Sequence, residues 1–258
     1  MPVRGYRDWE SFEIASAGSV ASRPVAFCAD LSPASVLGAY RRGIFPLPAA
    51  DERFRTINEV RYSDEVADGS IGLVGTGRSD PYWVAWWSPD PRPVIGVGQV
   101  HLGRNTRKWL RRSEVRTTAN ARFGQVAQAC RAGREPRWLT SALLATLTEL
   151  HAQGWAHSIE VWLDGDLIGG AMGIGTGRVI SGDSLFGRSS AAARVAVADM
   201  AARLELAGGE LVDAQWDSPF LRALGAAPVP RERYLPLLAG AGRVALPAAP
   251  LEARRLLP

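Results

Sequence analysis

The sequence predicts an α+β protein, and three features of its second half carry this prediction. Over 157–186, β-branched and apolar residues alternate with turn signals at Asp164-Gly165 and at 175–177, which predicts three antiparallel strands. A helical pattern of apolar residues follows, and a short apolar segment then returns as a strand. With 258 residues, 47% of them hydrophobic, the chain is long enough to bury a sizeable core.

The helix of this β-β-β-α-β unit covers 191–207 and is stopped by Gly208-Gly209. The strand at 210–215 ends in Asp213 and Gln215, which we expect on the same face because they lie two residues apart. Such a unit brings Asp183, the helix start and this pair to one cleft. The alternative is that Asp183 lies in a turn and that the pair caps a strand.

The rest of the chain supplies shorter signals. We expect a partly ordered arm with one short strand at 1–27 and a loosely attached tail at 241–258. Residues 48–82 are rich in charged and small residues, which predicts an inserted loop with a weak hairpin around 71–74. Helices are expected at 34–42, stopped by Gly43, at 104–112, at 120–130 with Asn120 as its cap, and at 141–153.

Composition excludes several classes of protein. No apolar run reaches the ~20 residues that span a bilayer, and the first residues are too polar for a signal peptide, so we expect a soluble, cytoplasmic protein. The two cysteines and three histidines have no spacing that would hold a metal, and none is predicted. The net charge is +4, carried by arginine apart from the single lysine Lys108, which permits RNA binding without requiring it.

Several motifs occur in a fixed order along the chain. They are DLSPASVLGAYRRGIFP at 30–46, WWSPDPRPVI at 86–95, WLT at 138–140, AHSIEVW at 156–162, GGAMGI at 169–174, GDSLF at 182–186 and VDAQ at 212–215. In this order they resemble the leucyl/phenylalanyl-tRNA–protein transferase family, from 30 to 235 apart from the insertion.

The chain also departs from the family pattern. Leu47 stands where relatives have a tryptophan that lies against the nucleotide end of tRNA, and Asp183 replaces a glutamate. Aromatic residues of the insertion that could replace the lost contact are Phe54, Tyr62, Tyr82 and Trp83. At the helix start Ala191 and Ala193 replace two residues with hydrogen-bonding side chains.

The resemblance implies a small N-terminal domain, 1–96, followed by an acetyltransferase-like (GNAT) domain, 97–240, with a mixed sheet flanked by helices. It implies transfer of leucine or phenylalanine, with methionine also conceivable, from charged tRNA to an N-terminal Arg or Lys of a protein, which marks that protein for N-degron degradation. No cofactor, metal or membrane takes part, and a monomer is expected.

The resemblance also assigns residues. Asp213 would hold or help deprotonate the attacking amine, Gln215 would orient it or steady the oxyanion, and Asp183 would engage the α-ammonium of the donor. The other substrate-binding candidates are Ser184, Ala171, Ile180, Leu185, Val197, Met200, Leu204, Val212 and Trp138. The basic candidates for tRNA are Arg92, Arg104, Arg107, Lys108, Arg111 and Arg112, the last five spaced as one helix face.

Two other functions stay open. An acetyl-coenzyme A-dependent N-acyltransferase would use the loop at 188–193. This loop faintly resembles the loop by which acetyltransferases bind pyrophosphate, but it has alanines where that loop has glycines. A degenerate protein that binds tRNA or protein N-termini without catalysis is the third possibility, against which the retention of Asp213 and Gln215 argues.

Overall fold

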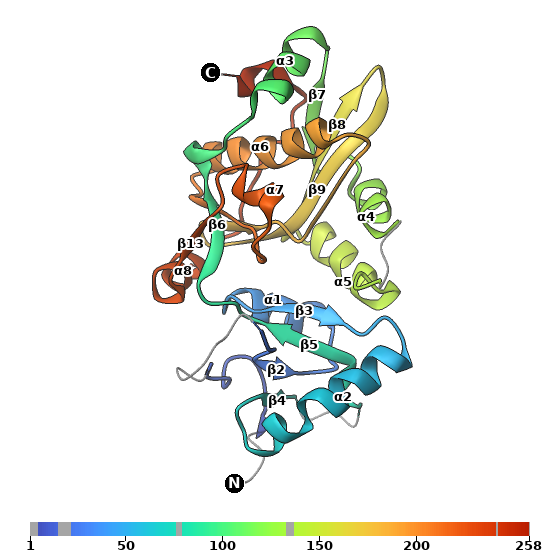
Figure 1. The fold of residues 1–258 in the computed structure, drawn as a ribbon, viewed down its shortest axis with the longest axis vertical. Coiled ribbons are helices and arrows are strands. Elements are labelled where there is room, and N and C mark those ends of the chain that lie inside the picture. Colours follow the sequence, from blue (N-terminus) through green and yellow to red (C-terminus); the bar gives the residue numbers. More distant parts are fainter. Residues whose placement is uncertain (1–4, 15–21, 76–78, 133–136, 241, 258) are drawn as a thin grey trace. The chain divides into compact units, whose positions relative to one another are not determined.

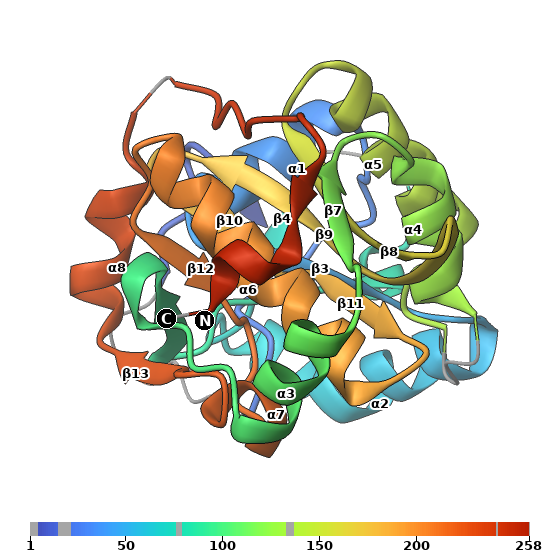
Figure 2. The same cartoon turned by 90° about the horizontal axis from the view of Figure 1, so that it is seen from above.

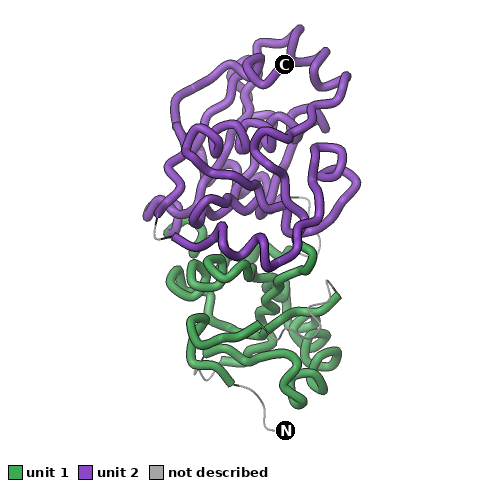
Figure 3. The backbone as a smooth tube through the Cα atoms, turned by 90° about the vertical axis from the view of Figure 1, so that its left-hand side faces the viewer, with its two compact units in different colours: residues 1–91, 133–149 green, residues 92–132, 150–258 purple. Residues whose placement is uncertain are grey.

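The structure is a computed structural model, and it describes residues 5–14, 22–75, 79–132, 137–240 and 242–257. The chain divides into two compact units (Figure 3). Unit 1 combines residues 1–91 with 133–149, and unit 2 combines residues 92–132 with 150–258. Helix α5 (Ser141–Ala152) runs from the second segment of unit 1 into unit 2.

Unit 1 is built on a mixed sheet with the strand order β1-β4-β2-β5-β3. Ser32 caps α1, and Gly43, with a φ of 70°, follows it, as the sequence predicts. The strands are β1 (Gly5–Tyr6), β2 (Ala26–Phe27), β3 (Phe45–Pro48), β4 (Gly72–Val74) and β5 (Val84–Trp87), and the helices are α1 (Pro33–Tyr40), α2 (Glu52–Ala67) and the 3-10 turn η1 (Pro81–Trp83).

The expected loop at 48–82 instead contains a helix of 16 residues, α2, and the strand β4. Asp51 caps α2 by accepting from Phe54 N, and the helix packs Tyr62 and Val66 against Phe27 and Ala85 of the sheet. Nor is there a hairpin at 71–74, because β4 pairs in parallel with both β1 and β2. The sequence did not predict this helix because most residues of α2 are polar and face outward, and only a short apolar stripe packs against the sheet.

Unit 2 holds a second mixed sheet with the order β13-β6-β12-β10-β9-β8-β7-β14, and β11 pairs with β9 beside this path (Figures 1 and 2). Its strands are β6 (Arg92–Gly96), β7 (Arg116–Ala119), β8 (Ala156–Leu163), β9 (Asp166–Thr176), β10 (Val179–Ser181), β11 (Ser184–Gly187), β12 (Leu211–Asp213), β13 (Ala227–Val229) and β14 (Leu251–Glu252). Its helices are α3 (Arg104–Arg112), α4 (Phe123–Arg131), α6 (Ser190–Leu206), α7 (Pro219–Arg222) and α8 (Arg231–Leu238), with 3-10 turns η2 (Val97–Gln99) and η3 (Ala253–Leu256).

Two consecutive residues of β9, whose side-chain positions point to opposite faces, show which helix covers each face of this sheet. A Cβ at Gly169 would contact Ala192 of α6, whereas a Cβ at Gly170 would lie 3.0 Å from Val126 of α4. Helix α6 therefore covers one face, and α4 covers the other. The α6 side holds the main apolar core of the unit.

The expected third strand is split in two. Ile180 of β10 pairs with Gly175, whereas Ser184 of β11 pairs with Met172, so one extra residue is accommodated between them as a bulge. At this break a Cβ on Gly173 would lie 1.5 Å from the Ser181 carbonyl oxygen, so only glycine fits opposite it. The bulge redirects the backbone at Asp183, whose N–H donates to Met172 O at 3.0 Å.

Two further expectations need correction. The tail is not loosely attached, because β14 pairs with β7, and Arg203 of α6 donates to Ala249 O at 3.0 Å. Helix α4 begins at Phe123, and Asn120, with a φ of 61°, precedes it in a turn. The buried Glu160 carboxylate performs the capping by accepting from Arg122 N at 3.2 Å.

Candidate active site

Three of the predicted residues meet at the break between β10 and β11. Gln215 Nε2 donates to Asp183 Oδ1 at 2.6 Å, and the Gln215 backbone N–H donates to Asp213 Oδ1 at 2.9 Å. Strand β12 runs parallel to β10 with Asp213 opposite Ser181, and Gly182 N donates to Asp213 O at 2.8 Å. Asp183, Asp213 and Gln215 therefore lie together as predicted, whereas the start of α6 packs against Gly169 and Gly187, at the end of β11 away from Asp183.

Gln215 reaches Asp183 by a route that differs from the expected one. The strand ends at Asp213, and Gln215 has a φ of 57°, in the left-handed region that non-glycine residues rarely adopt. Its side chain is therefore not placed by strand alternation. A turn after the strand directs it toward Asp183, and the hydrogen bond to Asp213 closes that turn.

Two further residues complete the polar centre. Arg92 donates from Nε to Asp213 Oδ1 and from Nη2 to Asp213 Oδ2, both at 2.9 Å, and Tyr234 OH donates to Asp213 Oδ2 at 2.8 Å. All three side chains are buried. Arg92 is thus engaged inside unit 2 and cannot serve as the phosphate contact that the sequence suggested. Sequence reasoning missed Tyr234, whose only signal was its place near the end of the region, 30–235, that resembles the family.

Burial and pairing fix the protonation of these two partners. Burial disfavours the charge on Arg92, but attraction to Asp213 outweighs it, so the pKa of Arg92 lies above its usual range. Burial and the Asp213 charge together raise the pKa of Tyr234 well above that of a free phenol. Arg92 therefore stays charged and Tyr234 keeps its proton near neutral pH.

The predicted apolar donor pocket is filled by packed side chains. Six of its seven residues belong to the main core of unit 2, and Leu185 packs against that core half-buried. The six are Ala171, Ile180, Val197, Met200, Leu204 and Val212. Ser184 lies on the sheet face opposite α6, and its Oγ is buried with no hydrogen-bond partner among the described residues. A donor side chain can enter this core only if these residues repack.

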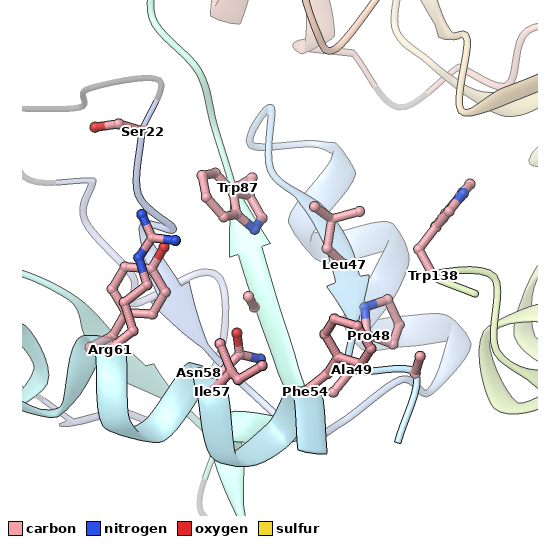
Figure 4. A pocket seen from close by; sticks show the side chains of 13 residues that line it. Ser22, Leu47, Pro48, Ala49, Phe54, Ile57, Asn58, Arg61, Trp87 and Trp138 are labelled. Carbon is pink, nitrogen blue, oxygen red and sulfur yellow. The ribbon is translucent and has the colours of Figure 1, made fainter. Parts of the chain in front are cut away.

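Trp138 belongs to unit 1, where it lines a cavity of about 300 Å³ (Figure 4). Leu47 and Trp87 line the same cavity, and α2 contributes Phe54 and Arg61. Of the four aromatic candidates in the inserted segment, Phe54 and Tyr62 reach this cavity. Tyr82 instead packs against Phe27, with ring centroids 4.9 Å apart, and Trp83 is partly exposed on η1.

The remaining basic candidates lie on α3, which forms at 104–112 as predicted. Leu110 and Thr106 are buried beneath the helix, while Arg104, Lys108, Arg111 and Arg112 are exposed and Arg107 is half-buried. These five residues therefore form a basic surface that we call the α3 face. Among the described residues no group of three or more His, Cys, Asp and Glu is placed to hold a metal ion, and no described helix is long and apolar enough to cross a membrane.

The fold and the polar centre define a mixed α/β protein with a buried, fully paired carboxylate at the end of a strand. A family model described as leucyl/phenylalanyl-tRNA protein transferase matches residues 94–239. Similar proteins named leucyl/phenylalanyl-tRNA–protein transferase include one from Teredinibacter turnerae, 39% identical over 81% of this chain and 71% of its own length. Others come from Klebsiella pneumoniae strain 342 (36% identical, 81% and 77%) and Idiomarina loihiensis (34%, 88% and 85%). The chain belongs to the leucyl/phenylalanyl-tRNA–protein transferase family.

Proposed function

We propose that this enzyme transfers leucine or phenylalanine from charged tRNA to an N-terminal Arg or Lys of a protein and thereby marks that protein for N-degron degradation. Family membership supports the activity, and the contact of Gln215 with Asp183 beside Asp213 is the observation that carries it to this chain. Charged tRNA is used where proteins are made, so we place the activity in the cytoplasm. We propose that the monomer is the active form.

The reaction is aminolysis of an ester: the amine nitrogen bonds to the ester carbonyl carbon, the carbon–oxygen bond to the tRNA ribose breaks, and a proton of the amine leaves with the ribose oxygen. The enzyme therefore has to align a neutral amine with the ester carbonyl and accept hydrogen bonds from the amine. Gln215 meets this requirement. Gln215 Nε2 donates to Asp183 Oδ1, so Oε1 is the end of the amide left to accept from the amine. Asp183 would set this orientation as well as engage the α-ammonium of the donor.

The donor side chain would enter the core beside β11, where Ser184 and Leu185 lie. Entry requires the packed residues on α6, Val197, Met200 and Leu204, to move, and unbranched Met200 adapts most readily. A single methylene changes discrimination by only about 1–3 kcal/mol, so leucine, phenylalanine and methionine all remain to be compared as donors.

The tRNA would use two surfaces. The α3 face offers exposed guanidinium groups to phosphates of the acceptor stem. The cavity in unit 1 would receive the nucleotide end, with Phe54 of α2 taking the stacking role that Leu47 cannot perform. In this arrangement the inserted segment compensates for the departure at Leu47.

We also propose the finer fold, an acetyltransferase-like domain built on the sheet of unit 2. The division expected between 1–96 and 97–240 is not kept, because β6 (Arg92–Gly96) pairs with β12 and β13 of that sheet and 133–149 belongs to unit 1. In support of the fold, β10 and β12 pair in parallel, and beyond Ser181 the chain leaves β12 to continue as β11, which pairs with β9 alone. The two strands thus separate beside the polar centre, and the start of α6 follows directly after β11.

The coenzyme A alternative finds no support at the start of α6. Ser189 Oγ accepts from Ala192 N at 3.2 Å, so this helix N-terminus already has a side-chain cap. Arg188 pairs with Asp166 at 3.1 Å, and Ala192 is fully buried against Gly169. A pyrophosphate would have to displace the cap and would still meet alanine Cβ atoms.

The test is transfer of radiolabelled leucine, phenylalanine or methionine from charged tRNA to peptides that begin with Arg, Lys, Asp or Ala. We expect transfer to Arg and Lys peptides, and Gln215→Ala should lower kcat by about 100-fold or more. Gln125→Ala, which removes an exposed glutamine from α4, is the matched control and should keep full activity. No transfer by the wild-type chain to any of these peptides would refute the proposed function.

A further inference from the structure

We propose that Asp213 takes no proton during transfer, and that Arg92 and Tyr234 are positioning residues that act through Asp213 to hold Gln215 in its working orientation. This inference rests on the proposed function and assigns parts to residues that touch neither substrate. It also replaces the expected part of Asp213 in deprotonating the amine by a part in positioning Gln215.

The first step is the occupancy of the Asp213 carboxylate. Oδ1 accepts from Arg92 Nε and from the backbone N–H of Gln215, and Oδ2 accepts from Arg92 Nη2 and from Tyr234 OH. A carboxylate offers about four lone-pair sites, so these four donors fill them all. With 1% of Asp213 exposed, an approaching amine finds no acceptor site on it.

The second step is that Arg92 and Tyr234 keep the protons that they donate to Asp213. Attraction to Asp213 raises the pKa of Arg92 in spite of its burial, and burial raises the pKa of Tyr234, so both remain donors across the pH range of an assay. The Arg92 guanidinium also lies 5.0 Å from the centre of the Tyr234 ring. The three side chains therefore form one interlocked group, which we call the Asp213 lock.

The third step connects the Asp213 lock to Gln215. The left-handed backbone of Gln215 is unfavourable for an L-residue and persists only where its surroundings impose it. The hydrogen bond from Gln215 N to Asp213 is what imposes it, and the side chain then reaches Asp183. If Asp213 turns or shifts, Gln215 loses this conformation and its amide loses its direction.

Two roles for Asp213 can be separated by a double substitution. Asp213→Asn leaves the buried Arg92 charge uncompensated, and we expect kcat to fall by about 100-fold. Adding Arg92→Gln removes that charge and restores a neutral amide pair, so the double variant should recover at least about tenfold in kcat over Asp213→Asn. If Asp213 accepts the proton, the double variant will be no more active than Asp213→Asn, which would overturn the proposal.

Tyr234→Phe provides an independent test that changes a single hydroxyl. Losing one donor to the carboxylate should lower kcat about tenfold, with little change in KM for the peptide and the same pH profile. If Asp213 is the base, freeing its lone pair strengthens it, and the acid limb of the profile will move to higher pH. That shift would refute the proposal even if the double variant fails to fold.

The chain offers a matched control in the same unit. Arg203 and Asp199 form another fully buried pair, joined at 2.6 Å within α6. Arg203 also donates to Thr117 O of β7, and three strands of the sheet separate β7 from β12, which Gln215 follows. Both Arg203→Lys and Arg92→Lys should lower the melting temperature. Only Arg92→Lys should also lower kcat, and Arg203→Lys should leave it unchanged. Equal kcat for the two variants would make the Asp213 lock merely structural. Transfer by the wild-type chain is measured first, so a failure of the proposed function itself is recognised separately.

Discussion

The stability of unit 2 should depend on pH through one buried histidine. His157 on β8 is 3% exposed, and its Nδ1 lies 3.2 Å from Asn120 Nδ2. Burial, with repulsion from His151 as a smaller cause, lowers the pKa of His157 to about 4. In the unfolded chain the same imidazole has a pKa of about 6.5.

The direction and size of the effect follow from these two values. Between pH 6.5 and pH 4 the unfolded chain binds a proton that folded His157 does not bind, so acidification favours unfolding. Each pH unit costs about 1.4 kcal/mol, which gives a total near 3 kcal/mol across the window. Above pH 6.5 the histidine is neutral in both states, and its contribution is constant.

The assay is urea denaturation of the wild-type chain and of His157→Gln at several pH values from 7.5 to 4. Carboxylates elsewhere titrate equally in both proteins, so the difference between their free energies of unfolding isolates His157. We expect the wild type to lose about 3 kcal/mol relative to the variant on going from pH 7 to pH 4. His101→Gln, which replaces an exposed imidazole, is the control. Parallel curves for wild type and His157→Gln would refute the reasoning.

Three other substitutions test the bulge, the α3 face and the cavity. Gly173→Ala drives a Cβ into the Ser181 carbonyl and should cost about 3 kcal/mol or more in thermal unfolding, whereas Gly124→Ala, with open space around it, should not destabilise. Replacing Arg111 and Arg112 by alanine should weaken tRNA binding and reduce the slope of log K against log salt by about 2; an unchanged slope would exclude phosphate contacts there. Phe54→Ala should raise KM for charged tRNA about 5-fold to 100-fold, and an unchanged KM would argue against stacking.

The local patterns predicted much of unit 2. The Asp164-Gly165 turn, α3 and α6 form where periodicity and turn residues indicate them, and so does α5, which begins in unit 1, because these signals act between near neighbours in sequence. The second hairpin turn falls at Gly177-Arg178 and not at 175–177, since Gly175 and Thr176 still pair with Ile180 and Val179. The family and the mixed α/β class were also predicted correctly.

Pairings between distant segments were not predictable in this way. Arg92 was assigned to tRNA binding because nothing near it in sequence reveals its partner Asp213, which lies 121 residues away. Tyr234 was missed for the same reason. The tail was predicted to be loosely attached because its few apolar residues form no pattern along the sequence. They are buried only because the tail packs against β7 and α6. Helix α2 was likewise predicted to be a loop, because its many charged residues hid the two residues, Tyr62 and Val66, that pack against the sheet.

The course of the chain through the two units bears on how the protein folds as it is made. Unit 1 is complete only when 133–149 has joined 1–91, for example through the hydrogen bond from Thr146 Oγ1 to Leu31 O at 2.5 Å. By then 92–132 has also been synthesised, although β6 still lacks β12 and β13. Unit 1 can therefore fold first on the ribosome only while 92–132 of unit 2 is already made and still lacks its partner strands, and no single cut of the chain would release either unit whole.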